Sequence, residues 1–223
     1  MKNEENLNMD LEYLIHGIDC HMVLEHICPP REGLYVLEPG CGSGKLGLWY
    51  AIRGAEVVLL DIDKDALEYA EALAVMASKR TGLDILKHTT FTTGSIHNLP
   101  YPDNTFDLVF NEGISQHWGR NPHDWRRQKS INEMVRVVKP NSPVCVIASN
   151  ALNPIIMRQA LEISHDYKGM PAKQKPYTSA ELVQRLRQAG VAPESIRVIP
   201  VGTSDWELTP LIAGWGNKGY AYK

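Results

Sequence analysis

Apolar and polar positions along this chain follow two periods, one typical of buried strands and one typical of helices. Short apolar runs predict strands at residues 34–38, 55–60, 88–92, 106–110, 143–149, 195–201 and 218–222. Helical patterns between them predict helices at residues 45–53, 64–80, 122–138 and 179–189. Strands that alternate with helices favour parallel pairing, and the last two strands, which lack a helix between them, favour an antiparallel pair. We therefore expect an α/β fold with helices on both faces of one sheet.

A glycine-rich loop joins the first of these strands to the helix at residues 45–53. The apolar run ends at Glu38, and Gly40, Gly42 and Gly44 follow at alternate positions. Glycine adopts positive φ and has no Cβ, so such a loop can turn tightly and bring its backbone close to a ligand. The next strand is followed by Asp61, which is placed to accept hydrogen bonds from a ribose.

Two features separate this loop from the dinucleotide-binding fingerprint. Its spacing is G-x-G-x-G, without a third glycine three residues after the second, and Glu38 lies two residues before the first glycine. The Glu38 carboxylate would repel a pyrophosphate and attract a cation. The pattern therefore suggests a nucleoside that carries positive charge, with an ordinary strand-to-helix turn as the alternative.

Three segments together resemble the class I S-adenosylmethionine-dependent methyltransferases, in particular the type 11-like domain. They are the glycine loop, residues 94–110 (GSIHNLPYPDNTFDLVF) and residues 131–140 (INEMVRVVKP). The resemblance covers roughly residues 34–150. It implies a Rossmann-like three-layer sandwich with a seven-stranded, mostly parallel sheet whose last strand is antiparallel. It also implies S-adenosylmethionine as the cofactor and S-adenosylhomocysteine as the product.

The resemblance assigns cofactor contacts to residues at the ends of the strands. Glu38 is expected at the methionine end, directly or through the loop, and Asp61 at the ribose. Asp63 is interpreted as the cap of the following helix. The other expected contacts are the backbones of Gly40, Gly42, Gly44 and Asn111, and the side chain of Ile62 against the adenine.

The adenine end departs from the family. Many relatives have Asp after the glycine that matches Gly94, and this chain has Ser95. A hydroxyl can accept a hydrogen bond from the adenine amine, though more weakly than a carboxylate. We therefore expect Ser95 and the backbone of Ile96 to bind the adenine, with lower cofactor affinity than usual.

The candidate catalytic residue is His117, in the polar and aromatic segment after the fourth strand. Its pKa should lie near neutrality, so it could act as a general base, or it could instead hydrogen-bond the loop. Glu112 is either a contact of the cofactor or acceptor, or a solvated loop acid. Methyl transfer from a sulfonium mainly needs alignment of the acceptor, so catalysis does not require a base.

We expect residues 1–223 to form a single methyltransferase domain. Its parts would be an N-terminal helical arm (1–31), a cofactor-binding core (34–150), a lid (151–177), and a C-terminal helix with a strand pair (178–223). The lid and residues 202–217 are candidate walls of an acceptor pocket, and the latter could instead form a subunit contact.

The arm contains side chains of the types that bind zinc, including His16 and Cys20, which would share a helix face. Their spacing matches no strong metal pattern, so no metal is expected. A helix packed over the cofactor pocket is the preferred interpretation. The side chains expected to face the pocket or the core are Tyr13, Leu14, His21 and Met22.

Composition and one motif indicate the class of methyl acceptor. The 223 residues include 26 acidic residues against 23 Lys and Arg, which gives no basic footprint for long nucleic acid. The order Asn111-Glu112-Gly113-Ile114 also lacks the Pro-Pro-aromatic run of nucleic-acid amino-methyltransferases. A small-molecule acceptor is therefore expected. The alternatives are a non-catalytic cofactor-binding partner subunit, methylation of a protein or RNA, and a nicotinamide-dependent oxidoreductase.

The expected cellular location depends on two features that are not evident in the sequence. No secretory leader and no apolar run long enough to span a bilayer are evident, so a cytoplasmic protein without membrane partners is expected. Four widely spaced cysteines fit reduced thiols. The acceptor, the attacking atom and the oligomeric state, including a homo-oligomer, are left open.

Overall fold

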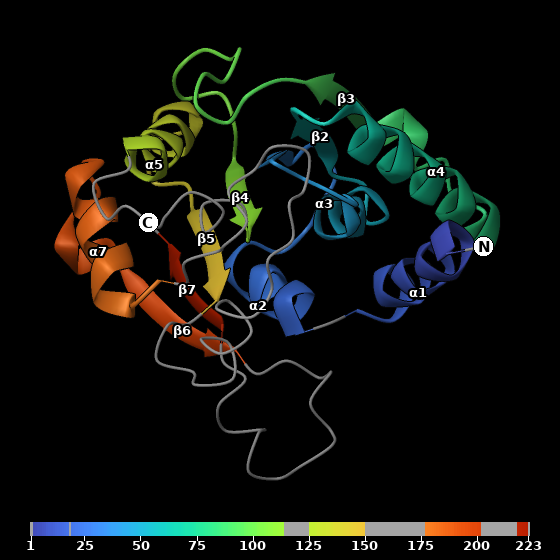
Figure 1. Cartoon of the computed structure of the whole chain (residues 1–223), viewed down its shortest axis with the longest axis horizontal. Helices are drawn as coiled ribbons and strands as arrows, with labels where there is room; N and C mark the ends of the chain where they lie inside the picture. Colours follow the sequence, from blue (N-terminus) through green and yellow to red (C-terminus); the bar gives the residue numbers. More distant parts are fainter. Residues whose placement is uncertain (1, 18, 114–124, 150–176, 202–217, 223) are drawn as a thin grey trace, which may run out of the picture.

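The computed structural model describes residues 2–17, 19–113, 125–149, 177–201 and 218–222. These residues form a seven-stranded sheet with the order β3-β2-β1-β4-β5-β7-β6 (Figure 1). Only β7 is antiparallel to its neighbours, β5 and β6, as the sequence predicts. The strands are β1 Tyr35–Pro39, β2 Glu56–Asp61, β3 Thr89–Thr93, β4 Leu108–Glu112, β5 Val144–Ser149, β6 Arg197–Val201 and β7 Lys218–Tyr222.

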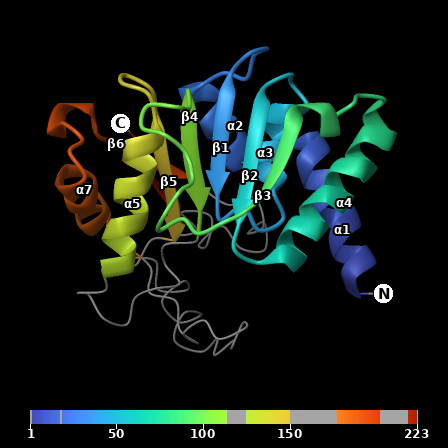
Figure 2. The same ribbon diagram turned by 90° about the horizontal axis from the view of Figure 1, so that it is seen from above.

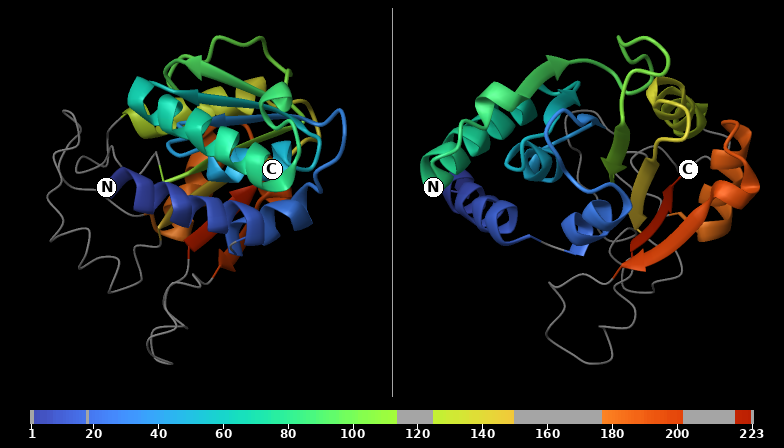
Figure 3. Two further views of the ribbon diagram at one scale, coloured as in Figure 1. Left: turned by 90° about the vertical axis from the view of Figure 1, so that its right-hand side faces the viewer. Right: turned by 180° about the vertical axis from the view of Figure 1, so that it is seen from behind.

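Helices cover both faces of the sheet (Figure 2). Helices α1 to α4 contribute to one apolar core, and α5 and α7 contribute to the other. Helix α1 contacts α3 and α4, and Figure 3 shows it running beside α4. The helices are α1 Lys2–His16, α2 Asp19–Ile27, α3 Lys45–Ala51, α4 Lys64–Thr81, α5 Trp125–Val137 and α7 Ser179–Gln188, with short 3-10 turns at Leu86–His88 and Pro193–Ser195.

Neighbouring residues of the central strands face opposite cores. In β2, Val57 and Leu59 join the core beneath α1 to α4, whereas Val58 and Leu60 join the core beneath α5 and α7. All four side chains are almost completely buried. Burial on both faces explains why the strands are continuous apolar runs rather than alternating ones. The expected Rossmann-like three-layer class is confirmed.

The predicted boundary of the fourth strand is wrong by two residues. Strand β4 covers Leu108–Glu112, not 106–110. The backbone N–H groups of Thr105 and Phe106 donate to the carbonyl oxygen of Val137, at the end of α5, so these residues are held by the helix end before the strand begins. Asn111 and Glu112 consequently belong to the strand and not to the loop after it.

The N-terminal arm consists of two helices instead of the single helix expected. Helix α1 ends at His16, and the next residue, Gly17, has a φ of 83° and a Cβ there would lie 2.8 Å from the Trp49 ring. His16 and Cys20 therefore do not share a helix face. Leu14 and His21 are fully buried, as expected.

Met22 contradicts the prediction for the arm, because 67% of it is exposed. It lies on the solvent side of α2, next to the buried His21.

Within the described residues, no helix is both long and apolar enough to cross a membrane.

Candidate functional site

The carboxyl ends of β1, β2 and β4 meet at one edge of the sheet, and the glycine loop crosses this edge between β1 and α3. Gly40, Gly42 and Gly44 have φ values of 74°, 52° and 69°. These left-handed conformations strain any residue with a Cβ. The N–H of Gly40 donates to the carbonyl of Leu60 across 2.6 Å, which ties the loop to the end of β2.

Glu38 supports the glycine loop from beneath. Its Oε2 accepts the backbone N–H of Gly47, in the first turn of α3, at 2.8 Å, and only 3% of Glu38 is exposed. A Cβ on Gly47 would lie 2.7 Å from this oxygen and 2.4 Å from the Leu59 side chain. Burial raises the pKa of Glu38 well above its ordinary value, although the Gly47 hydrogen bond acts in the opposite direction.

Asp61 supports the same loop from the side. Its two oxygens accept the backbone N–H groups of Gly42 and Asp63, each at 2.9 Å. Each oxygen keeps a further lone pair, so the carboxylate can still accept ribose hydroxyls. Asp63 caps α4 through the N–H of Asp65, as predicted. Ile62, beside Asp61, is 62% exposed, which leaves an apolar surface for an adenine.

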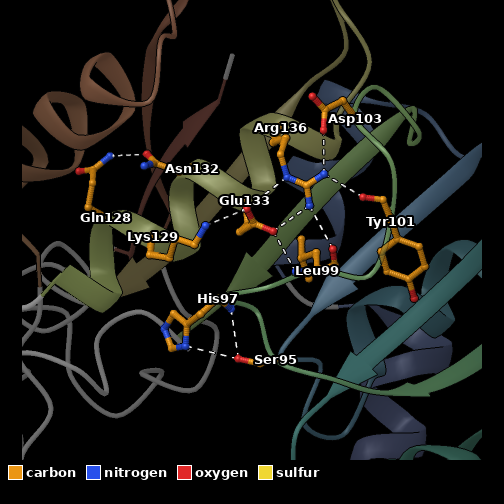
Figure 4. Close-up of polar contacts among 10 residues, drawn as sticks. All are labelled: Ser95, His97, Leu99, Tyr101, Asp103, Gln128, Lys129, Asn132, Glu133 and Arg136. Carbon is orange, nitrogen blue, oxygen red and sulfur yellow. Dashed lines mark hydrogen bonds and ion pairs between the residues drawn. The ribbon is translucent and has the colours of Figure 1, made fainter.

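Ser95 lies close to this edge, because the N–H of Gly94 donates to the carbonyl of Asp61 at 2.9 Å. The Ser95 hydroxyl accepts the N–H of His97 at 3.2 Å and lies 3.4 Å from His97 Nδ1 (Figure 4). It keeps acceptor capacity for an adenine amine. The Ile96 side chain is buried in the core, so only its backbone is available to a ligand.

Asn111 joins the ends of β1 and β4. Its side-chain amide donates to the carbonyl of Pro39 at 2.9 Å, and the residue is fully buried. No hydrogen-bond partner for the amide oxygen is found among the described residues. Because the side chain is enclosed, a cofactor contact by Asn111 would use its backbone, as the sequence interpretation proposed.

Helix α2 reaches the same edge of the sheet, where the sequence analysis predicted a helix of the arm, but the contacts it makes there had no signal in the sequence. His21 donates from Nε2 to the carbonyl of Lys45, the first residue of α3, at 3.1 Å, and its ring stacks on Trp49 at 4.4 Å. Cys20 Sγ lies 3.7 Å from a carboxylate oxygen of Glu112, at the end of β4. The arm therefore contacts both the helix after the glycine loop and the end of β4.

Acid should weaken the attachment of the arm. Burial lowers the pKa of His21 to about 4, so the folded protein favours the neutral ring. The resulting stabilisation is present above the unfolded pKa of about 6.5 and is lost as the pH falls toward 4. We expect the wild-type protein to lose up to about 3 kcal/mol of unfolding free energy over this range through His21. Denaturant unfolding at pH 7.5 and 4.5 measures the loss.

The variant His21→Phe keeps a ring against Trp49 but cannot be protonated, so its stability should depend less on pH. His16→Gln is the matched control, since His16 is exposed and pairs with Glu12 on the surface of α1. An equal pH dependence of His21→Phe and the wild-type protein would contradict the assignment.

Several predicted features lie outside the described residues: His117, nearly all of the lid, and residues 202–217. Tyr177, at the end of the predicted lid, is buried, and the Arg127 guanidinium lies 4.0 Å from the centre of its ring. The four cysteines all lie among the described residues, are buried and form no disulfide. No group of three or more metal-ligating side chains is found in the part of the chain that the structure describes.

A family model for a methyltransferase domain matches residues 37–146, from β1 to β5. The chain belongs to the class I S-adenosylmethionine-dependent methyltransferases. The matched region includes Asp61, Ser95, Asn111 and the whole glycine loop, which the geometry brings to one edge of the sheet.

Curated relatives support the family, and a solved structure supports the fold. An uncharacterized methyltransferase of Schizosaccharomyces pombe is 28% identical over 171 residues, covering 70% of this chain and 58% of that protein. Demethylmenaquinone methyltransferase of Symbiobacterium thermophilum is 28% identical over 199 residues, covering 78% of this chain and 74% of that protein. A crystal structure of an S-adenosylmethionine-dependent methyltransferase from Aquifex aeolicus has a TM-score of 0.59 at 20% identity, covering 100% of this chain and 97% of that one.

The matches do not extend over the whole of every relative. The chain spans little more than half of the S. pombe methyltransferase, as the 58% coverage shows. The Aquifex likeness, at 20% identity, concerns the fold alone.

Proposed function

We propose that this protein transfers a methyl group from S-adenosylmethionine to a small-molecule acceptor. The observation that carries the proposal is the support of the glycine loop by two strand-end carboxylates. Glu38 holds the loop through Gly47, and Asp61 holds it through Gly42. The three glycines of the loop have positive φ, and a Cβ on Gly42 would meet no other atom within 4 Å, which leaves space for a ligand beside the loop.

The side chains fit the parts of this cofactor. Burial raises the pKa of Glu38, and a cationic methionine end nearby would oppose that shift and favour the carboxylate, whereas a pyrophosphate would oppose its ionisation further. Asp61 has acceptor capacity for the ribose, Ile62 offers apolar surface to the adenine, and Ser95 with the Ile96 backbone offers hydrogen bonds to its edge. The cofactor supplies an activated methyl group on a sulfonium. The protein aligns the acceptor with that methyl and excludes water.

The net charge of the chain and the names of its relatives support a small-molecule acceptor. The chain has a formal net charge of −3, which does not favour a polyanionic acceptor. Relatives are named for small acceptors: norajmaline in Rauvolfia serpentina, demethylmenaquinone in Symbiobacterium thermophilum, and a phytyl hydroquinone in Oryza sativa. We therefore place hydroquinones and heterocyclic amines first in an acceptor panel. We also propose a cytoplasmic location.

Calorimetry with S-adenosylmethionine, S-adenosylhomocysteine and NADH tests the cofactor class. Micromolar binding of the first two compounds without binding of NADH would support the proposal. Binding of NADH alone would indicate an oxidoreductase. Binding of the expected cofactor without turnover on small molecules, proteins or RNA would favour a non-catalytic partner subunit.

The variant His117→Ala tests whether His117 is a general base. If it is, the variant should turn over more slowly than the wild-type protein but bind the cofactor equally well.

A further inference from the structure

Two side chains on α5 hold both polar groups of one peptide residue in the segment between β3 and β4 (Figure 4). Glu133 Oε2 accepts the backbone N–H of Leu99 at 2.9 Å. Arg136 Nη2 donates to the carbonyl oxygen of Leu99 at 3.0 Å, and its Nη1 donates to the carbonyl of Tyr101 at 2.8 Å. We call Glu133 and Arg136 the α5 clamp.

The clamp is also an ion pair, with Arg136 Nη2 2.8 Å from Glu133 Oε2. Lys129 approaches the other carboxylate oxygen at 3.2 Å, and Asp103 contacts Arg136 at 2.8 Å. Burial would raise the pKa of Glu133, but hydrogen bonds from Arg136, the Leu99 N–H and Lys129 lower it to about 2. The pair therefore stays charged throughout the pH range in which an enzyme of this kind works.

The clamped residue is connected directly to the adenine side of the proposed site. A turn joins Ser95 to Asn98, whose N–H donates to the Ser95 carbonyl at 3.0 Å, and Leu99 follows at once. The side chains of Ile96 and Leu99 are 6% and 3% exposed and pack in the same core. A movement of Leu99 would therefore move the turn that carries Ser95 and the Ile96 backbone.

We propose that Glu133 and Arg136 are positioning residues that set the adenine-recognition turn at residues 95–98. The inference rests on the proposed function, because it concerns the same cofactor site. Neither side chain needs to touch the cofactor. The guanidinium is planar and offers fixed, diverging donors, so Arg136 can bind the carbonyls of Leu99 and Tyr101 while it pairs with Glu133. A lysine keeps the charge but lacks this fork.

A different carboxylate provides a matched control. Asp107 also accepts a backbone N–H from a segment distant in sequence, that of Tyr35 at the start of β1 at 3.0 Å, and also pairs with a cation, Lys139 at 2.7 Å. It lies just before the start of β4, at the amino ends of the strands, away from the edge that carries the glycine loop. Asp107→Asn should therefore lower stability without affecting the adenine site.

The test compares two ligands that differ at the adenine amine: S-adenosylhomocysteine and its inosine analogue, S-inosylhomocysteine. The wild-type protein should bind the adenosine compound about fivefold more tightly, because inosine has a proton on N1, which the proposed Ile96 N–H contact would oppose, and lacks the amine that donates to Ser95. In Arg136→Lys and Glu133→Ala, the Kd for S-adenosylhomocysteine should rise about tenfold and the ratio between the two ligands should fall to within about twofold. Asp107→Asn should keep the wild-type ratio.

The outcomes separate the two hypotheses. If the wild-type protein binds neither compound, the proposed function fails and the role of the α5 clamp fails with it. If the wild-type protein binds and the folded clamp variants keep its ratio, only the clamp inference is overturned. If Glu133→Ala does not fold, the ratio of the two Kd values in Arg136→Lys, which retains size and charge, tests the inference instead. A loss of ratio in Asp107→Asn equal to that in the clamp variants would also overturn the inference, since general destabilisation would then explain it.

Discussion

Asp61→Ala is expected to raise the Kd for S-adenosylhomocysteine at least about tenfold. The substitution removes charge-assisted hydrogen bonds to the ribose, which contribute roughly 1.5–3 kcal/mol. It also removes the acceptor that holds the N–H of Gly42 at 2.9 Å, so the glycine loop loses its lateral support. Calorimetric titration measures the affinity, and circular dichroism establishes that the variant is folded.

Asp61→Asn separates the two roles of this carboxylate. An asparagine keeps one oxygen that can accept the Gly42 N–H, but it loses the charge and one acceptor. We expect an affinity between those of the wild-type protein and Asp61→Ala. Wild-type affinity in a folded Asp61→Ala protein would remove Asp61 from the ribose site.

Gly47→Ala is expected to destabilise the protein by about 1–3 kcal/mol, as overpacking of a closely packed site does. Glycine to alanine inside a helix normally stabilises by about 0.5–1 kcal/mol. Here the added Cβ would lie 2.4 Å from the Leu59 side chain and 2.7 Å from Glu38 Oε2. The crowding should reverse the usual sign and displace the carboxylate beneath the loop. Urea unfolding measures the change in free energy.

A double variant identifies the cause. Leu59→Val shortens the side chain that the new methyl group meets, so Gly47→Ala should cost less in that background than in the wild-type protein. Additive losses in the two single variants would argue against crowding at Leu59. A Gly47→Ala protein that is more stable than wild type would contradict the packing directly.

The sequence predicts the order and type of the elements well, because the central strands are buried on both faces and therefore read as continuous apolar runs. It also predicts the cap at Asp63, where a short acid precedes a helical pattern. The start of β4 is missed, because the N–H groups of Thr105 and Phe106 bind the end of α5, a tertiary contact without a local signal. The break in the arm has a local signal in Gly17, which the helical interpretation overlooked.

The candidate site is predicted only where a residue type or a motif has one clear chemistry. The glycines and Asp61 belong to this group, and the structure places them together. Gly47 could have been suspected, since a glycine inside a helix often marks a close approach. The α5 clamp depends on where the segment before β4 packs, so the spacing of Glu133 and Arg136 alone indicates only an ion pair within one helix.

The bond between Asn111 and the carbonyl of Pro39 joins residues 72 positions apart in sequence. Strands β1 and β4 are neighbours in the sheet, yet β2, α4 and β3 are synthesised between them. A growing chain thus presents the whole glycine motif on β1 long before β4 arrives to complete that edge of the sheet. Bringing β1 and β4 together costs conformational entropy, and this cost slows the pairing of strands that are distant in sequence. A ligand at this edge would therefore bind only chains in which β4 has already paired with β1.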